Sequence, residues 1–153
     1  MPRPTLGTDN RVLRVYRLLN RHRARYLLAG GVAANLHGSV RATKDVDILV
    51  PRDEANMARV LAALAALPHG VARELDPSEL VRCPITIVGD DPRVDILTVA
   101  WTVRFEQAWE RRVVRRIQST RVPYLGRDDL IASKRTGRPA DQADIDVLRS
   151  LPK

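Results

Sequence analysis

The stretch "RATKDVDILV", residues 41–50, places two carboxylates at the start of a predicted β-strand. Side chains alternate between the two faces of a strand, so Asp45 and Asp47 point to one face. Val46 and Ile48 point to the other face, which is suited to a core. Carboxylates this close raise each other's pKa and repel, unless a cation lies between them. A bound cation or a solvent-exposed strand end would each account for the pair.

A second stretch has the same local pattern. The sequence "RVDILT", residues 93–98, repeats the acid, isoleucine and leucine of "DVDILV". It follows "PITIV" and the turn "GDDP", so residues 84–99 are predicted to form a hairpin. If the strands containing Asp47 and Asp95 are neighbours, Asp95 joins Asp45 and Asp47 on one side of the sheet. Three clustered carboxylates would suit Mg²⁺ better than zinc. His22, His37 and His69 are scattered and are predicted to be structural or exposed.

A pair of glycines precedes the first acidic stretch. "RYLLAGG", residues 25–31, is predicted to be a short buried strand that ends at Gly30 and Gly31. A short helix follows at once and stops at Gly38. Glycines at such a turn let a ligand approach the backbone, and a helix N-terminus offers N–H groups to an anion. Taken alone, a glycine pair before a helix is usually only a turn.

The rest of the chain alternates helical and extended patterns. Residues 69–76 fit either a strand or a loop, and residues 113–125 fit one or two short edge strands. Helices are predicted at 9–23, 54–68, 101–112, 127–135 and 141–151. The 153 residues are 44% apolar, which fits one domain with a hydrophobic core. We therefore expect an α+β (mixed α/β) fold over 1–153, with a central mixed sheet in a core of about 25–125 and a helical segment at about 126–151.

The chain is strongly basic, with a net charge of +8 that comes mostly from arginine. Arginine suits phosphate contacts, so RNA is the first candidate for a polyanionic partner. The alternative is a solvated basic surface. The densest basic segment contains Arg111, Arg112, Arg115 and Arg116. Aromatic residues make up only 4% of the chain, which gives little support for a platform that stacks single-stranded bases.

The sequence also bears on compartment. It has no apolar run of the ~18–20 residues that a membrane span needs. The first ten residues contain no apolar segment of the kind found in secretory signals. A single cysteine, Cys83, cannot form an internal disulfide and is expected to be a small buried hydrophobic residue. We therefore expect a cytoplasmic protein that does not enter membranes.

Taken together, "GGVAANLHGSVRATKDVDILV" resembles the signature of the DNA polymerase β-like nucleotidyltransferase superfamily. Members have a glycine pair or Gly-Ser, then a D-x-D pair, then a third acid on a later strand. The form with Arg41, Thr43, Asp45, Asp47 and Ile48 is most similar to minimal bacterial members, the AbiEii-like toxin and small antibiotic nucleotidyltransferases. The tail "DLIASKRTGRPADQADIDVL" also resembles these proteins, so the likeness covers roughly residues 25–150. Gly31 departs from the pattern, because many members have serine there.

This resemblance implies a reaction and a set of roles. Nucleotidyl transfer uses two Mg²⁺ ions, which Mn²⁺ can replace, to activate an acceptor hydroxyl and hold a nucleoside triphosphate. Asp45 and Asp47 would bind both ions, and Asp95 would bind the catalytic ion. The implied nucleotide-binding residues are Gly30, Gly31, Arg41, Thr43 and Lys134. For Arg41 the alternative is a solvated loop charge, and Lys134 could instead pair with Asp141 or Asp144.

The acceptor stays open at this point. An RNA acceptor, such as a tRNA 3′ end modified by a toxin with an antitoxin partner, fits the basic charge. A small-molecule adenylyltransferase that modifies an antibiotic is a second reading. A non-catalytic nucleotide- or RNA-binding member is a third.

Overall fold

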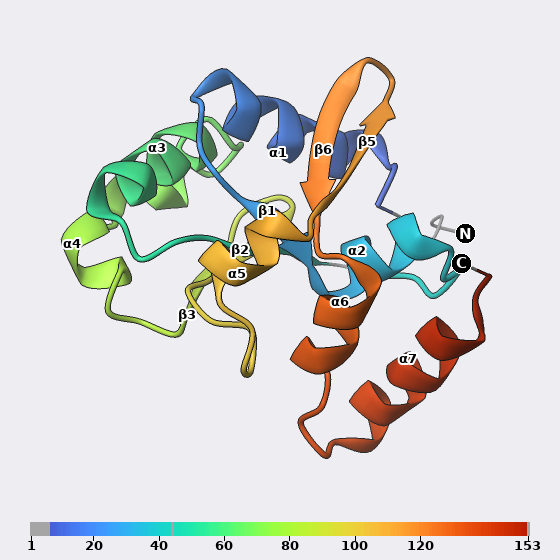
Figure 1. The fold of residues 1–153 in the computed structure, drawn as a ribbon. Helices are drawn as coiled ribbons and strands as arrows, with labels where there is room; N and C mark the ends of the chain where they lie inside the picture. The colour runs from blue at the N-terminus through green and yellow to red at the C-terminus, as the bar shows by residue number, and fades with distance from the viewer. Residues whose placement is uncertain (1–6, 44, 153) are drawn as a thin grey trace.

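A computed structural model describes residues 7–43 and 45–152 of the chain. Residues 1–6, which are most of the segment in which we expect no secretory signal, lie outside the described residues. Lys44, which precedes Asp45, lies outside them as well. Within them, seven α-helices surround one six-stranded sheet with the strand order β3-β4-β2-β1-β6-β5 (Figure 1). The expected mixed α/β class with a central mixed sheet is confirmed.

The elements follow one another as a series of short helices and strands. Their bounds are α1 Asn10–Arg21, β1 Leu27–Ala29, α2 Gly30–His37, β2 Asp45–Leu49, α3 Glu54–Leu64, the 3₁₀-helix η1 Val71–Glu74, α4 Pro77–Leu80, β3 Ile85–Val88, β4 Arg93–Leu97, α5 Phe105–Glu110, β5 Val113–Ile117, β6 Thr120–Tyr124, α6 Arg127–Ser133 and α7 Pro139–Ser150.

The register at the centre of the sheet positions the acids. Strands β2 and β4 are parallel neighbours, and Asp47 is paired with Asp95. On its other side β2 is antiparallel to β1, and Asp47 is paired there with Ala29. The glycine pair follows Ala29 directly, so the sheet brings Gly30 and the two acids to one place. The predicted hairpin of 84–99 forms as β3 and β4.

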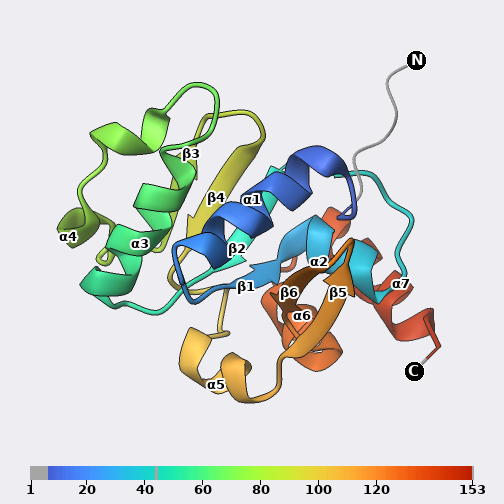
Figure 2. The same ribbon diagram turned by 90° about the horizontal axis from the view of Figure 1, so that it is seen from above.

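Helices α1 and α3 pack together along one face of the sheet (Figure 2). The apolar residues of α1, including Val12, Tyr16 and Leu19, recur at helical spacing and are fully buried. Asp9 and Asp53 accept hydrogen bonds from first-turn N–H groups, and so cap α1 and α3 respectively. Val46 and Ile48 are fully buried, whereas Asp45 and Asp47 on the other face of β2 are only half-buried.

Four local expectations were wrong or incomplete. Helix α5 begins at Phe105 rather than 101, because Ala100 and Val103 close a tight turn in which Trp101 has φ 57°. Residues 71–74 form a 3₁₀-helix, whereas a strand or a loop was expected for 69–76. Helix α4 was missed, although Asp76 and Pro77 form a good N-cap and first position. Strand β6 is not an edge strand, because it pairs with β1 as well as β5.

The residues set aside as structural behave mostly as expected. His22 and His37 bond to the carbonyls of Leu18 and Leu125 at 2.9 and 2.8 Å. Cys83 is half-buried rather than buried, so that expectation was wrong. No helix in residues 7–43 and 45–152 has the length and apolarity needed to cross a membrane.

Candidate active site

The paired acids of β2 and β4 lie in an open cleft of about 430 Å³. Asp47 and Asp95 line it, together with Gly30 at the start of α2 and Lys134 at the end of α6. An apolar wall of the same cleft includes Ile85, Leu97 and Trp101. The cleft therefore combines carboxylates, cations and an apolar surface, which is the composition of a site that binds a charged ligand and a second, less polar one.

Asp47 has the most perturbed carboxyl group of the cleft. Burial, followed by the charges of Asp95 and Asp45, raises the pKa of Asp47 to about 6. The cations Lys134 and Arg93 act in the opposite direction but do not cancel the effect. The carboxylates are thus short of positive charge, which is the condition that the sequence predicted for a cation site.

Arg93 is the cation that these acids hold in this structure. Its Nε and Nη2 donate to the two carboxylate oxygens of Asp95 at 2.9 and 3.1 Å. Its Nε also lies 3.8 Å from Oδ2 of Asp45. The arginine therefore bridges β4 and β2 on the acidic face.

The carboxylates suit Mg²⁺ chemically, because oxygen ligands of full negative charge are those that this ion prefers. The guanidinium on Asp95 and Asp45 is a stand-in cation, which supports the fit. In the described part of the chain, however, no three His, Cys, Asp or Glu side chains are already grouped closely enough to hold a metal. In this arrangement Arg93 is bonded to Asp95 and lies near Asp45, so the three acids do not form a joint ligand set.

Gly30 is required by the packing of Asp47. A Cβ atom at Gly30 would lie 1.9 Å from Oδ2 of Asp47, and Gly30 has φ 58°. Both facts exclude a larger residue. Helix α2 starts here with no side-chain cap on Ala29 and no acid in its first turn, so its first N–H groups are available to an anion. This arrangement supports the predicted role of the glycine turn beside a phosphate.

The departure at Gly31 has a structural reason. A Cβ atom there would lie 2.7 Å from both Cβ and Oγ1 of Thr43. A serine at this position would collide with Thr43 unless that residue shifted. Gly31 and Thr43 therefore depend on each other, because a side chain at position 31 would occupy the space that Thr43 fills.

The remaining predicted nucleotide-binding residues line a smaller cavity of about 180 Å³ beside the cleft. Gly31, Arg41 and Thr43 lie on one side of it, and Lys134 is shared with the main cleft. Lys134 is buried and its Nζ lies 3.0 Å from Oδ2 of Asp144, while Arg41 pairs with the other oxygen of Asp144. The alternative of a Lys134–Asp144 ion pair is thus realised, and Arg41 is not a free loop charge.

The basic segment expected to bind RNA is divided by the fold. Arg111 forms a two-pronged pair with Asp129, at 3.0 and 2.9 Å. Arg112 lies over the ring of Trp109 and bonds to its carbonyl. Arg115 and Arg116 are exposed on β5, and the tip of the β5–β6 hairpin lies far from α6 and α7 (Figure 1). The four arginines therefore differ in their local contacts, and their binding of RNA stays a prediction.

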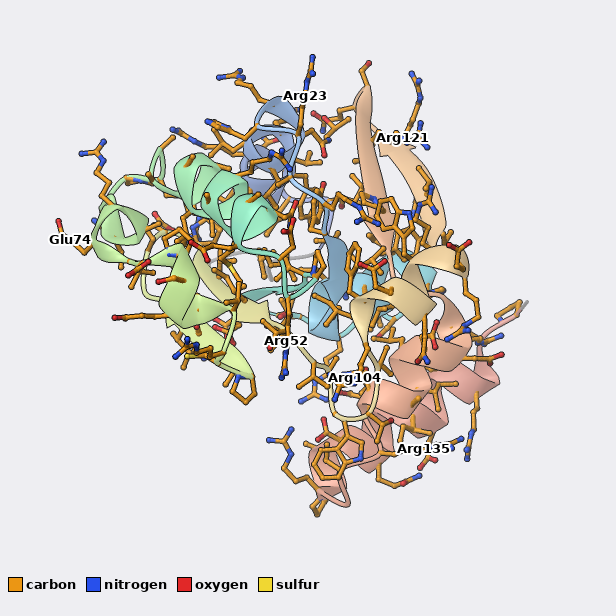
Figure 3. All side chains as sticks on the ribbon, turned by 60° about the vertical axis from the view of Figure 1, so that its left-hand side comes forward. Arg23, Arg52, Glu74, Arg104, Arg121 and Arg135 are labelled. Atoms are coloured by element: carbon orange, nitrogen blue, oxygen red, sulfur yellow. The ribbon has the colours of Figure 1, made fainter. Side chains whose placement is uncertain are left out.

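Other arginines are spread over several sides of the molecule. Figure 3 shows Arg23 and Arg121 at the top, Arg52 and Arg104 near the middle, and Arg135 below. Such a distribution fits a generally basic protein better than a single stripe of charge.

Sequence reasoning missed Arg93 and Trp101 in the cleft, and named Asp141 only as an alternative partner of Lys134. Arg93 could have been found, because it lies two residues before Asp95 and therefore on the same face of β4. Asp141 accepts from Arg138 at 2.8 Å and from Thr136, and so holds the turn that borders the cleft. Trp101, which is 57% exposed, lacked any signal beyond being a tryptophan.

Comparisons with known proteins agree with this fold. No protein-family model matches the sequence, and no curated protein matches it. Among solved structures, an antigenic nucleotidyltransferase-like protein from Paracoccidioides brasiliensis is similar, with a TM-score of 0.53. The two share 18% sequence identity, over 90% of this chain and 72% of that one. The chain therefore has a nucleotidyltransferase-like fold, and the likeness to AbiEii-like toxins stays a prediction.

Proposed function

We propose that the protein is a Mg²⁺-dependent nucleotidyltransferase that moves a nucleoside monophosphate from a triphosphate to an acceptor hydroxyl. The observation that carries this proposal is the pairing of Asp47 with Asp95, next to the glycine turn at the start of α2. A nucleotidyltransferase-like fold supports it at the level of the protein class.

Each part of the cleft has a role in this proposal. Asp45, Asp47 and Asp95 would hold two Mg²⁺ ions, or Mn²⁺, which would supply Lewis-acid activation of the acceptor hydroxyl and of the phosphates. The N–H groups around Gly30 and Gly31 bind the triphosphate. Lys134 and Arg41, which share Asp144, add positive charge beside it, and Thr43 lines the same cavity. Asp95 lies next to the apolar wall, where it accepts the proton of the acceptor hydroxyl.

RNA is the acceptor that we propose first, with a tRNA 3′ end and a toxin-like role that an antitoxin would control. The supporting observation is on the β5–β6 hairpin, where Arg116 is paired directly with Arg121. Like charges directly opposite each other destabilise a hairpin, and a bound polyanion would relieve the repulsion.

A neutral small molecule, as in antibiotic adenylylation, is the second candidate. It is favoured by the apolar wall, since Ile85 and Trp101 are 50% and 57% exposed beside Asp95. A hydrophobic acceptor would cover these side chains and place its hydroxyl at the acids.

The experiment is incubation with each α-labelled nucleoside triphosphate, Mg²⁺ and total cellular RNA, with Asp45→Ala as the inactive control. Label that enters tRNA-sized RNA with the wild type alone would establish an RNA nucleotidyltransferase and identify its nucleotide. Label that enters low-molecular-weight material from a cell extract instead would support the second candidate. No transfer to either, with Mg²⁺-dependent triphosphate binding intact, would contradict the proposal and leave a binding protein.

The RNA arm has a separate test that leaves the packing intact. Replacing Arg115 and Arg116 with serine should reduce the slope of log affinity against log salt by roughly 1.4, since each lost phosphate contact on a single strand removes about 0.7. Arg111→Ser, which removes an arginine paired within the protein, is the matched control. An unchanged slope in the double variant would show that the hairpin does not contact RNA.

A further inference from the structure

The guanidinium of Arg93 already lies among the acids, so a metal ion would have to compete with it for them. Arg93 donates to both oxygens of Asp95 and lies 3.8 Å from Asp45. A carboxylate that accepts a two-pronged, charge-assisted pair has its best oxygen lone pairs engaged. Asp95 therefore cannot offer those lone pairs to a divalent ion while the guanidinium stays in place, and the positive charge 3.8 Å from Oδ2 of Asp45 opposes a second cation there.

Arg93 is free to leave without disturbing the core. Its side chain is 43% exposed, at the first position of β4, and its hydrogen bonds are to Asp95 alone. The backbone pairing of β4 with β2 and β3 does not depend on the side chain. A long, flexible arginine at such a position can turn toward solvent at small cost.

The same side chain borders the site proposed for the triphosphate. Arg93 lines the cleft together with Ala29 and Gly30, at the N-terminus of α2. The other cations that line this cleft, Lys134 and Arg138, are each paired with an acid from α7. Arg93 is the one of the three whose acidic partners would themselves be taken over by a metal.

We propose that Arg93 is a displaceable counter-ion that couples metal binding to nucleotide binding. Without metal it neutralises Asp45 and Asp95. A divalent ion displaces it from both, and the released guanidinium then pairs with the phosphates of the nucleotide. This inference rests on the proposed function, since it needs the three acids to bind metal. By linkage, metal and nucleotide each strengthen the binding of the other.

The test is a titration with Mn²⁺ alone, followed by electron paramagnetic resonance of the free ion, on the full chain without nucleotide. Arg93→Gln should bind Mn²⁺ about tenfold more tightly than the wild type, because the ion no longer has to displace a charge-assisted, hydrogen-bonded pair from Asp95. Arg138→Gln is the matched control, because it removes the same charge from the same cleft without freeing Asp95. Its affinity should stay within about twofold of the wild type.

The second measurement is the affinity for ATP in the presence of saturating Mg²⁺. Arg93→Gln should weaken it about tenfold, the effect of losing one charged hydrogen-bonding partner of a phosphate. Tighter metal binding and weaker nucleotide binding in one variant is the signature of the coupling. Arg93→Lys, which keeps the charge but not the two-pronged contact, should shift Mn²⁺ affinity in the same direction by less, and it serves if the glutamine variant fails to fold.

Two results would overturn the inference, and they differ in what else they affect. If the wild type binds Mn²⁺ and Arg93→Gln binds it equally well, Arg93 does not compete and the proposed function stands. If neither protein binds Mn²⁺, with or without ATP, the metal assignment fails and the inference fails with it. If the Mn²⁺ affinities of Arg93→Gln and Arg138→Gln change equally, the effect comes from the loss of one positive charge in the cleft, and the inference is also overturned.

Discussion

Two arginine–aspartate pairs in this protein have nearly the same geometry and different surroundings. Arg93–Asp95 and Arg111–Asp129 are both two-pronged, with contacts of 2.9 and 3.1 Å in the first and 3.0 and 2.9 Å in the second. In both, the aspartate side chain is only 10% exposed and the arginine is much more open. The difference lies in the charges around them.

The Arg111–Asp129 pair is balanced, with one cation and one acid. It joins the end of α5 to the first turn of α6, beside Gly126, whose absent Cβ leaves room for the backbone of Arg111. Arg93 instead forms ion pairs with both Asp95 and Asp45, and Asp47 is paired with Asp95 on the neighbouring strand. The same contact therefore joins two helices in one place and leaves uncompensated negative charge in the other, and unbalanced charge of this kind is concentrated at functional sites.

The largest effect that separates the two pairs is on catalysis. Asp95→Asn should lower the rate of nucleotidyl transfer by about 10³-fold, the upper end of what losing one preorganised charged group costs. Asp129→Asn, the matched change in the other pair, should leave the rate within about threefold, because Asp129 does not line the cleft. Single-turnover rates with labelled nucleotide, on variants with wild-type circular dichroism, measure both. Loss of transfer in both variants would end the distinction.

The second effect is on stability against pH, measured in the presence of a chelator. Burial and the neighbouring acids raise the pKa of Asp47 from 3.8 to about 6, so the folded protein binds this proton more readily than the unfolded chain does. The free energy of unfolding should therefore rise as pH falls from 7 through 6 to 4, by up to about 3 kcal/mol. Urea unfolding across this range, compared with Asp47→Asn, isolates the contribution.

The direction in which stability changes with pH distinguishes Asp47 from an acid in a simple ion pair. An acid held by a simple ion pair has a lowered pKa and would lose stability on acidification. Asp141 is such an acid, because hydrogen bonds from Thr136 and Arg138 outweigh burial and lower its pKa below 3.8, outside the window used. A stability that falls between pH 7 and 4 only in the wild type, and not in Asp47→Asn, would contradict the charge imbalance at the cleft.

The central part of this site could be predicted from local sequence. Alternation along "KDVDILV" and "RVDILT" places the acids on one strand face each, and the shared pattern suggested that the strands are neighbours, as the register shows. The same alternation places Arg93 on the face of β4 that carries Asp95. Whether Asp95 then pairs with this arginine or with a metal ion is a separate question. Periodicity alone does not decide that.

The rest depended on contacts between distant parts of the chain. Asp144 binds Arg41, which lies 103 residues earlier, as well as Lys134, ten residues earlier. Only the packing of α7 near α6 and α2 makes one acid serve both. In the same way, the start of α5 was set by a turn at Trp101 with positive φ, a conformation that tryptophan rarely adopts and that sequence patterns do not predict.

The third prediction concerns the glycine that makes room for Asp47. Gly30→Ala should lower the transfer rate by about 10²-fold, because the added Cβ displaces the carboxylate from its position beside Asp95. Gly137→Ala is the matched control: it also has positive φ, at 83°, but its Cβ would meet nothing within 4 Å. It should lose only about 1 kcal/mol of stability and keep its activity. Equal losses of activity would show that backbone strain, not the clash with Asp47, is responsible.

The smallest effect returns to the structural pair. Asp129→Asn should lower the free energy of unfolding by about 1–2 kcal/mol. The asparagine amide is neutral and has one acceptor oxygen, so it can accept only one of the two hydrogen bonds that Arg111 donates to Asp129. Mg²⁺ should not change this loss, because no other carboxylate was found to contact Arg111 in the described residues. Asp95→Asn should behave differently: it removes one of three repelling acids, so its loss of stability in chelator should be smaller than that of Asp129→Asn. Denaturant midpoints with and without Mg²⁺ compare the two, and equal losses would mean that the acids of the cleft are already as well balanced as Asp129.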